Sequence, residues 1–253
     1  MSNKKEREKR REERLQEEAK VQTGDRRTKL LQLGAGAVFL VIVAVVVLIV
    51  ASSGGESGGD AENLQEVAAA ESVVNGVPQN GMVLGDPKAE VELIEYGDMQ
   101  CPVCKAYSEE ILPQVIENQV RNGKAKMVFH NFTIIGPQSL PSGAAVLAAG
   151  EQDRGWDYLE VFYRNQGAEN SGYADDAFLT AVAEASGVKD VAKWNQDRKK
   201  LTSEVEASTE QAQRYGFTGT PSFAIKGPST NGVELLGNPA TPEEFEEAIE
   251  EAG

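Results

Sequence analysis

An uncharged run of apolar residues near the N-terminus constrains this chain more than any other feature of its sequence. No charged residue falls between Leu30 and Gly55, and Leu33–Ala51 reads LGAGAVFLVIVAVVVLIVA. As a helix, these 19 residues would be roughly 28 Å long at about 1.5 Å per residue, close to the ~30 Å hydrocarbon core of a bilayer. No polar face interrupts the run, which disfavours a buried helix of a globular core. We therefore expect residues 30–51 to form a single transmembrane helix.

The charges on the two sides of this run predict its orientation. Residues 1–29 hold 11 lysines and arginines and 7 acidic residues, a net charge of +4. The residues after the run hold 14 lysines and arginines and 33 acidic residues, a net charge of −19. Because basic residues favour the cytoplasmic side of a membrane, we expect a charged cytoplasmic tail over 1–29 and an extracytoplasmic acidic part. The small residues after the run make a poor cleavage site, so a retained signal-anchor in the cell membrane is favoured over a cleaved signal peptide.

The residues that follow divide into a linker and one domain. Ser52–Asp60 reads SSGGESGGD, the composition of a flexible linker. Residues 61–72 suit a short helix, and the turn-forming segment NGVPQNG after them stops its continuation. We predict an extracytoplasmic flexible linker over 52–80 and a single folded domain over 81–253.

The overall composition excludes several classes of protein. The chain has 253 residues, two cysteines, one histidine and a net charge of −15. Two cysteines cannot form a disulfide framework, and with one histidine they are too few for a closed zinc site. A strongly acidic chain is also poorly suited to binding phosphate backbones, so we expect no nucleic-acid partner.

Hydrophobic patterning predicts an α/β domain. Val91–Tyr96 alternates as a strand, Cys101 to Arg121 has the apolar stripe of a helix that Pro113 should kink, and residues 126–133 form a second strand. This order predicts a parallel strand–helix–strand unit. A mostly helical insert is expected over about 139–215, followed by a strand hairpin and a last helix. The expected segments are 142–151, 156–165, 175–185, 191–199 and 202–215 (helices), 222–225 and 233–236 (strands), and a final helix with Thr241 as N-cap, Pro242 at its first position and Glu244 closing a capping box.

Both cysteines fall in one tetrapeptide, Cys101-Pro102-Val103-Cys104, between the first strand and the helix. At this spacing the two sulfurs can bond across the first helical turn. The first sulfur also lies near unpaired N–H groups and the positive end of the helix dipole, both of which favour the thiolate that performs thiol–disulfide exchange. Three alternatives compete with a redox-active pair: a zinc half-site, which lacks two ligands; an inert disulfide, which would constrain only a short loop; and two chance buried thiols. An oxidising compartment favours the redox-active pair.

The wider sequence around this motif resembles a known family. EYGDMQCPVCKAYSEEILP (Glu95–Pro113), MVFHNF (Met127–Phe132) and YGFTGTPSF (Tyr215–Phe223) are similar to the DsbA-like thioredoxin-fold oxidoreductases, in particular the membrane-anchored kind of Gram-positive bacteria. The resemblance covers about 81–253. It implies a thioredoxin-like α/β fold with a helical insertion, here preceded by the transmembrane helix, and no cofactor besides the redox-active cysteine pair.

The resemblance also assigns roles to individual residues. Cys101 matches the exposed nucleophile and Cys104 the buried resolving thiol. Pro221 matches a cis-proline that faces the disulfide. The alternative for Gly219-Thr220-Pro221 is an ordinary turn that enters a strand. Thr220, just before the proline, would pair through its backbone with an extended substrate. Together with Thr220, the two residues between the cysteines, Pro102 and Val103, are the expected substrate-binding residues.

Two acids near the motif have different expected roles. Glu95 matches a buried acid that relays protons to the deeper thiol, although the polar side of a surface strand is the alternative. Asp98, in the turn before the helix, is expected to be structural. His130 lies on the second strand with no second ligand in view, so a structural or surface position is favoured over a proton relay. Val103 stands where strongly oxidising relatives often have histidine, which predicts a less oxidising pair.

The sequence therefore predicts a thiol:disulfide oxidoreductase that forms disulfides in exported proteins with cysteine pairs. A membrane thiol oxidase, quinone-linked by resemblance, would reoxidise the Cys101–Cys104 pair. A reductase or isomerase of the same fold is the nearest alternative, because the direction depends on reduction potential and partner. Two alternatives belong to other classes of protein. One is a membrane-tethered binding module with a passive disulfide, and the other is a protein that delivers metal ions through the two thiols.

Overall fold

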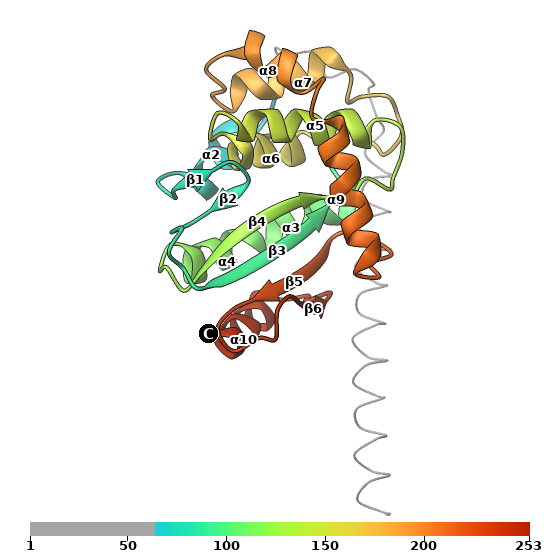
Figure 1. Cartoon of the computed structure of the whole chain (residues 1–253). Coiled ribbons are helices and arrows are strands. Elements are labelled where there is room, and N and C mark those ends of the chain that lie inside the picture. Colours follow the sequence, from blue (N-terminus) through green and yellow to red (C-terminus); the bar gives the residue numbers. More distant parts are fainter. Residues whose placement is uncertain (1–63) are drawn as a thin grey trace, which may run out of the picture. The chain divides into compact units, whose positions relative to one another are not determined.

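Strand β3 (Val91–Gly97) forms the centre of the sheet because apolar residues cover both of its faces. The computed structural model describes residues 64–253. Six of the seven residues of β3 are buried in it. It pairs in parallel with β4 (Ala125–Asn131) and antiparallel with β5 (Ser222–Lys226). With β1 (Gln79–Asn80), β2 (Val83–Leu84) and β6 (Glu234–Gly237), the described sheet has the order β1-β2-β4-β3-β5-β6 (Figure 1). The two predicted strands and their parallel pairing are confirmed.

The connection from β3 to β4 is helical but broken. Helix α3 (Pro102–Glu110) ends just before Ile111, α4 (Leu112–Val115) follows, and a π-helical turn, η2 (Ile116–Val120), completes the crossover. Pro113 has no N–H to donate, so the helix cannot continue unbroken through it. The single kinked helix that the sequence predicts is therefore three short segments.

The helical insert between β4 and β5 is confirmed and forms a layer of its own (Figure 1). Two buried indoles hold it in place: Trp156 donates to the carbonyl of Met82 at 2.9 Å, and Trp194 donates to that of Ala145, also at 2.9 Å. The insert consists of α5 (Ser139–Gly150), α6 (Gly155–Arg164), α7 (Asp176–Ala185), α8 (Val191–Asp197) and α9 (Thr202–Arg214).

The C-terminal part closes the other end of the sheet. Strand β6 (Glu234–Gly237) pairs antiparallel with β5, as predicted, and α10 (Pro242–Ala252) packs against β5 and α4 (Figure 1). Thr241 caps α10 by accepting from the N–H of Glu244 at 3.4 Å. The carboxylate of Glu244 accepts from the N–H of Ala240 at 2.7 Å, one residue before the N-cap that the capping-box prediction named.

The folded domain begins earlier than the predicted boundary at residue 81. Helix α2 (Val67–Val74) packs against α6, and its residues Ala70 and Val74 are buried in the main core. A small hairpin of β1 (Gln79–Asn80) and β2 (Val83–Leu84) then joins the sheet at β4. About half of the predicted linker, residues 67–80, is therefore part of the domain, because its small apolar residues fit against the insert.

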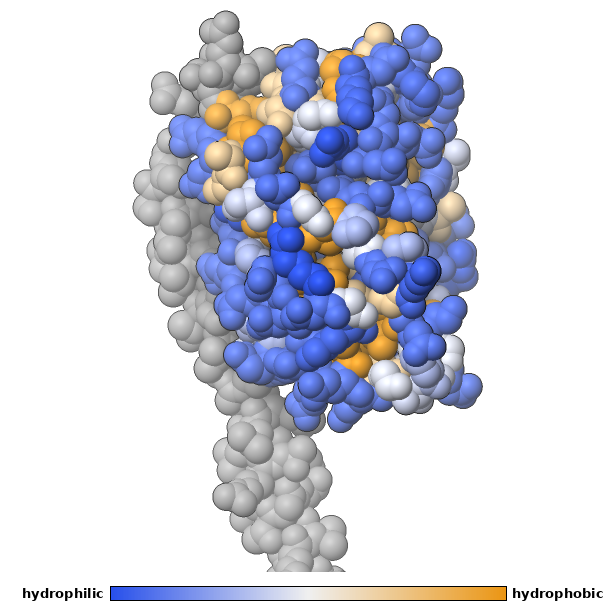
Figure 2. Space-filling model, turned by 90° about the vertical axis from the view of Figure 1, so that its left-hand side faces the viewer, coloured by the Kyte–Doolittle hydropathy of each residue, from blue (hydrophilic) through white to orange (hydrophobic). Residues whose placement is uncertain are grey.

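The surface of the domain is mostly hydrophilic (Figure 2). Among the residues that the structure describes, the large hydrophobic side chains with substantial exposure are Ile134 and Leu235, at 41 % and 48 %. The apolar residues instead fill one large core cluster and a smaller one on the opposite face of the sheet, around Ile94, Tyr96 and Phe132.

The predicted tail (1–29), the predicted transmembrane helix (30–51) and the first part of the predicted linker lie outside the described residues. Within 64–253, the structure has no helix that combines the length and the hydrophobicity needed to cross a membrane.

The packing of α2 can be tested with a pair of neighbouring substitutions. Ala70→Glu would place a carboxylate without a partner between α2 and α6, and we expect it to lower the free energy of unfolding by about 2 kcal/mol or more. Ala69→Glu, at an exposed position on the same helix, should change it by less than about 0.5 kcal/mol. Urea unfolding of both variants measures the difference, and equal stabilities would show that α2 is not part of the domain.

Candidate active site

The cysteine motif lies where β3 passes directly into α3. Cys101 is the N-cap of α3, with extended backbone dihedrals, and its sulfur accepts from the N–H of Cys104 at 3.4 Å. Pro102 occupies the first helical position, where a missing N–H costs no hydrogen bond. The first turn of the helix thus directs unpaired N–H groups and the positive end of its dipole at the Cys101 sulfur.

Both cysteines are free thiols, and both are buried. Cys104 is fully buried, as expected, but Cys101 is only 3 % exposed, so the expectation of an exposed nucleophile is wrong. The segment before β5 covers it: the Cys101 thiol donates to the carbonyl oxygen of Thr220 at 3.3 Å. The Thr220–Pro221 peptide bond is cis, as the family resemblance implies.

The two thiols differ in acidity. The Cys104 thiol lowers the pKa of Cys101 below its ordinary value, and the backbone N–H groups of Val103 and Cys104 add to this effect. Burial raises the pKa of Cys104 well above the ordinary value, and the Cys101 sulfur and Glu95 raise it further. Cys101 therefore ionises more readily than Cys104, which favours Cys101 as the nucleophile of the pair.

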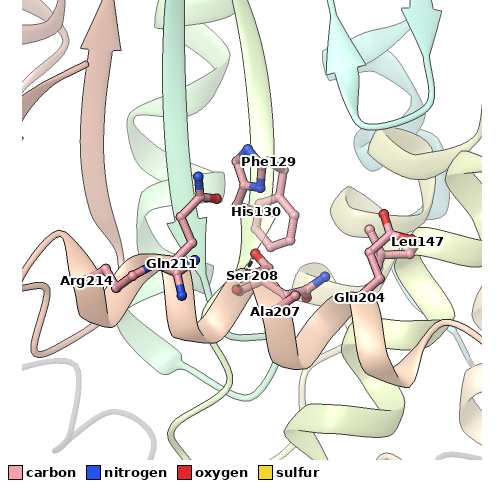
Figure 3. A pocket seen from close by; sticks show the side chains of 9 residues that line it. Phe129, His130, Leu147, Glu204, Ala207, Ser208, Gln211 and Arg214 are labelled. Carbon is pink, nitrogen blue, oxygen red and sulfur yellow. Dashed lines mark hydrogen bonds between the residues drawn. The ribbon is translucent and has the colours of Figure 1, made fainter. Parts of the chain in front are cut away.

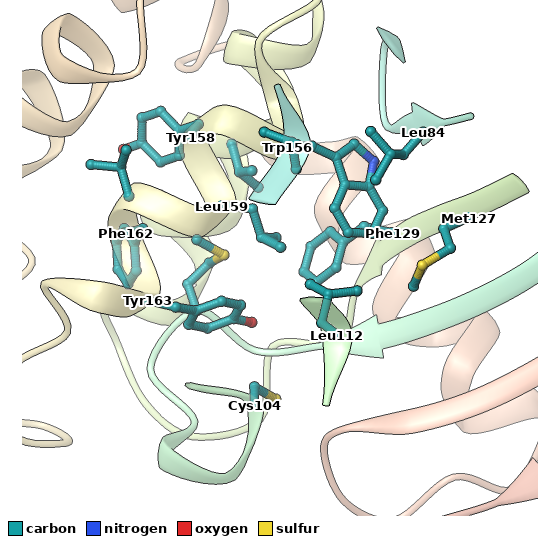
Figure 4. Close-up of a cluster of buried hydrophobic side chains, with 14 of the residues drawn as sticks. Leu84, Cys104, Leu112, Met127, Phe129, Trp156, Tyr158, Leu159, Phe162 and Tyr163 are labelled. Atoms are coloured by element: carbon teal, nitrogen blue, oxygen red, sulfur yellow. The ribbon is translucent and has the colours of Figure 1, made fainter. Parts of the chain in front are cut away.

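Behind Cys104 lies the aromatic part of the main core. Phe129 of β4 and Trp156, Phe162 and Tyr163 of α6 belong to the same buried cluster as Cys104 (Figure 4). The Cys104 sulfur is thus enclosed in an apolar core that excludes water, and burial has the largest effect on its pKa.

Glu95 lies on β3 in this apolar environment and is 1 % exposed, so the alternative of a surface carboxylate is wrong. Its partners on the neighbouring strands are Phe129 and Phe223, and neither of its oxygens has a hydrogen-bond partner among the described residues. Burial, together with the charge of Glu160, raises its pKa to about 8. Glu95 therefore holds a proton at neutral pH, and its charge acts on the pKa of Cys104.

Glu160, on α6, is a second buried acid that the sequence patterns did not identify. It is fully buried and accepts from the hydroxyl of Ser108 at 2.7 Å. Burial raises its pKa to about 7, and the Ser108 hydrogen bond and Arg164 oppose that rise. The sequence of its helix, GWDYLEVFYR, gave no signal of this burial, because Asp157, Glu160 and Arg164 recur at i, i+3 and i+7 and so form a polar face that predicts an exposed Glu160.

Asp98 has the structural role that the sequence predicts. One of its carboxylate oxygens accepts from the N–H of Gln100 at 2.9 Å, and the other accepts from those of Ile134 and Ile135 at 2.8 and 2.9 Å. These bonds tie the turn before α3 to the segment after β4.

A glutamine from the insert also holds this turn, and the sequence gave no sign of it. Gln166, just after α6, donates to the carbonyls of Met99 at 2.8 Å and Cys101 at 3.1 Å. No pattern around Gln166 indicates this contact, because its partners lie more than 60 residues earlier in the chain.

His130 lies away from the cysteines. Its ring stacks on Tyr96 with 5.1 Å between centroids, and burial lowers its pKa. It lines a cavity of about 340 Å³ between β4 and α9, together with Ser208, Gln211 and Arg214 (Figure 3). Neither cysteine lines this cavity, so the prediction that His130 is structural fits its position.

The structure thus brings most of the predicted site residues together. Cys101, Cys104 and Thr220 are in direct contact, and Glu95 acts on the pKa of the deeper thiol. Val103 is half-buried in the first turn of α3 and brings no charge to the site. A low-pKa thiol, a protonated thiol and a buried protonated acid form a set that suits thiol–disulfide exchange.

Comparisons with known proteins agree with this chemistry. A family profile described as Thioredoxin matches residues 78–251. A probable disulfide bond formation protein D from Bacillus cereus is 30 % identical over 58 % of this chain and 71 % of its own length. Disulfide bond formation protein D from Bacillus subtilis is 26 % identical over 77 % of this chain and 82 % of its own length. The crystal structure of oxidised BdbD from Bacillus subtilis superposes with a TM-score of 0.60 and 23 % identity, over 70 % of this chain and 98 % of that one. These likenesses confirm the predicted thioredoxin-like fold with a helical insertion.

The burial of Glu95 predicts how stability depends on pH. Because its pKa is about 8 in the folded protein against an ordinary value of 4.5, the native state binds a proton more tightly than the unfolded state. The free energy of unfolding should therefore fall as the pH rises from about 4.5 through 8. Glu95→Gln, which cannot ionise, should remove the part of this fall that Glu95 causes, while the part due to Glu160, whose pKa is raised to about 7, remains. The variant should be more stable than the wild type at pH 9 by up to about 4 kcal/mol.

Urea unfolding of the oxidised protein at several pH values tests this, because the disulfide removes the titration of the thiols. Glu90→Gln, an exposed change just before β3, should keep the wild-type pH dependence. A Glu95→Gln variant that loses stability with pH as steeply as the wild type would contradict the assignment.

Proposed function

The chain belongs to the thioredoxin family and is a DsbA-like thiol:disulfide oxidoreductase, and from this premise we propose that it forms disulfide bonds in exported proteins. The observation that supports this most directly is the asymmetry of the two thiols. The Cys101 sulfur lies at the N-terminus of α3 with a lowered pKa, while the fully buried Cys104 has a raised one. An oxidase needs this asymmetry for two reasons: a stabilised Cys101 thiolate favours the reduced pair that the reaction produces, and the substrate should attack only one of the two sulfurs.

In the proposed reaction, a thiolate of the substrate attacks the Cys101 sulfur of the oxidised pair. The Cys101–Cys104 bond breaks, a mixed disulfide forms, and the electron pair goes to the Cys104 sulfur. Glu95, which holds a proton at neutral pH and whose charge acts on the pKa of Cys104, supplies the proton for that sulfur. The second thiolate of the substrate then attacks the substrate's own sulfur in the mixed disulfide, and Cys101 leaves as the stabilised thiolate.

The substrate would bind along the edge formed by the segment before β5 and the first turn of α3. The carbonyl of Thr220, which accepts from the Cys101 thiol in the reduced protein, can accept from a substrate N–H once that thiol is oxidised. Pro221, cis in the structure, holds this carbonyl at the sulfur, and Pro102 and Val103 form the other side of the site. The cysteine pair itself is the redox group, and no further cofactor enters the reaction.

The proposed location is the outer face of the cell membrane. It rests on the uncharged run over 30–51 and on the change of net charge across it, from +4 before to −19 after. In this position the domain would meet exported proteins with cysteine pairs. A membrane thiol oxidase, quinone-linked by family resemblance, would return the Cys101–Cys104 pair to the disulfide.

Two cysteine variants test the proposed roles. Cys104→Ser should accumulate a mixed disulfide with a substrate protein that carries a disulfide, because the Cys101 thiolate attacks that disulfide, one substrate sulfur leaves as a thiolate, and no Cys104 thiol can then displace the substrate from Cys101. Cys101→Ser should form no mixed disulfide. Both variants should oxidise a reduced substrate protein at least 100-fold more slowly than the wild type. Non-reducing electrophoresis after acid quenching measures both properties, and wild-type rates in the two variants would refute the proposal.

Val103 offers a test of oxidising power. Val103→His would place a cationic ring in the first turn of α3, where it stabilises the Cys101 thiolate and so the reduced pair. We expect the reduction potential to rise by about 30 mV or more, a change of about 1.4 kcal/mol. Equilibration with glutathione measures it, with Val103→Asn as the uncharged control. An unchanged potential in Val103→His would show that this position does not set the potential.

A further inference from the structure

The turn that carries Cys101 is buried and closed on itself. The N–H of Cys101 donates to the carbonyl of Asp98 at 2.9 Å, which makes residues 98–101 a tight turn. Met99 and Gln100, in the middle of the turn, are fully buried. The carbonyl of Met99 takes no part in the turn's own hydrogen bond and cannot reach water. It therefore needs a donor from another segment of the chain.

Gln166 supplies this donor from the helical insert. Its Nε2 donates to the carbonyl of Met99 at 2.8 Å and to the carbonyl of Cys101 at 3.1 Å. The carbonyl of Cys101 also accepts from the N–H of Lys105 at 3.1 Å, which is the first hydrogen bond of α3. Because both neighbours of the amide are acceptors, its NH₂ end must face them, and both of its hydrogens are used.

The C-terminal end of α6 holds Gln166 in place. The side chain of Asn165 accepts from the N–H of Gln65 at 2.6 Å and donates to the carbonyls of Gln65 at 2.9 Å and Val161 at 2.8 Å. The N–H of Gln166 donates to the carbonyl of Tyr163 at 3.1 Å. The amide of Gln166 is therefore presented to the turn by a backbone that is already fixed.

Two other side chains hold the turn without bonding to Cys101. The carboxylate of Asp98 ties the turn to the segment after β4. The amide of Gln100 donates to the hydroxyl of Ser139 at 3.0 Å and accepts from the N–H of Asn170 at 3.2 Å. Gln166 is the side chain of the insert that bonds to the backbone of the reactive residue itself.

We propose that Gln166 is a positioning residue for the exchange reaction: by holding the carbonyls of Met99 and Cys101, its amide keeps the Cys101 sulfur at the N-terminus of α3. The proposal rests on the proposed function, because the position of this sulfur acts through the exchange that it performs. The amide of Gln166 stabilises the thiolate in two ways. It fixes the backbone that directs the N–H groups of Val103 and Cys104 at the sulfur, and it points the positive ends of its own N–H dipoles toward Cys101 without adding a charge.

The direct test is the titration of Cys101 in reduced Gln166→Met. Methionine has a similar length and volume but donates no hydrogen bond. The rate of the reaction of Cys101 with iodoacetamide, followed against pH, should have its midpoint about 0.5 to 1 pH unit higher than in the wild type. The equilibrium with glutathione should move about three- to tenfold toward the disulfide, because the reduced pair loses thiolate stabilisation.

The iodoacetamide reaction reports Cys101, because Cys104 is fully buried and its pKa is raised. The titratable groups that face Cys101 are Cys104 on α3, Glu95 on β3 and Tyr163 on α6. Since the substitution leaves all three unchanged, a shifted midpoint measures the effect of the Gln166 hydrogen bonds.

Gln152→Met is the matched control. Gln152 is another half-buried glutamine of the insert, and its amide also makes two hydrogen bonds to backbone. It donates to the carbonyl of Asp190 at 2.9 Å and accepts from the N–H of the same residue at 2.9 Å. Gln152→Met should lower the urea midpoint, as Gln166→Met does, but it should keep the wild-type titration of Cys101 and the wild-type glutathione equilibrium.

Gln166→Asn covers the case in which Gln166→Met does not fold. It keeps the amide on a side chain that is one methylene shorter, so the nitrogen cannot reach both carbonyls, and it should shift both measurements in the same direction. A wild-type midpoint and a wild-type glutathione equilibrium in a folded Gln166 variant would show a purely structural role and overturn the proposal. If the wild type does not oxidise reduced proteins, the proposed function fails, and the titration of Cys101 still decides whether Gln166 acts on its sulfur.

Discussion

Strand β3 is buried on both faces, and its carboxyl end leads directly into the first turn of α3. This junction fixes Cys101 at the helix N-cap and, through the antiparallel pairing of β3 with β5, brings Thr220 to within 3.3 Å of its sulfur. The insert contributes from the other side, where Gln166 holds the carbonyl of Cys101. The reactive sulfur is therefore held by segments that are far apart in the sequence.

Burial has two opposite effects in this site. At the edge, the Cys104 thiol, with smaller contributions from Thr220 and the N–H groups of α3, outweighs the burial of Cys101, and its pKa falls. One turn deeper, burial outweighs the backbone hydrogen bond at Asp98 that opposes it, so the pKa of Cys104 rises, as do those of Glu95 and Glu160. The same low dielectric thus separates the two thiols into a nucleophile and a protonated partner, and it provides protonated acids close to the second thiol.

Local patterns predicted the parts of the structure that depend on local residues. The motif from Cys101 to Cys104, the strands beside it and the helical insert follow from spacing and periodicity, and the family resemblance supplied the cis bond at Pro221. The missed features depend on contacts between distant segments. Glu160 meets Ser108 across 52 residues, and α2 has too few large apolar residues for its packing on α6 to be visible in the sequence. The burial of Cys101 was missed for the same reason, since the covering carbonyl lies 119 residues away.

The central claim is that one sulfur of the pair is acidic and the other is not. The ultraviolet absorbance of thiolate, followed against pH in the reduced wild type and in Cys101→Ser, separates the two titrations. We predict that the wild type shows a thiolate that titrates below the ordinary range of cysteine, and that Cys101→Ser shows thiolate only well above that range. A wild-type protein without thiolate at neutral pH, or a Cys101→Ser variant that keeps it, would contradict this account.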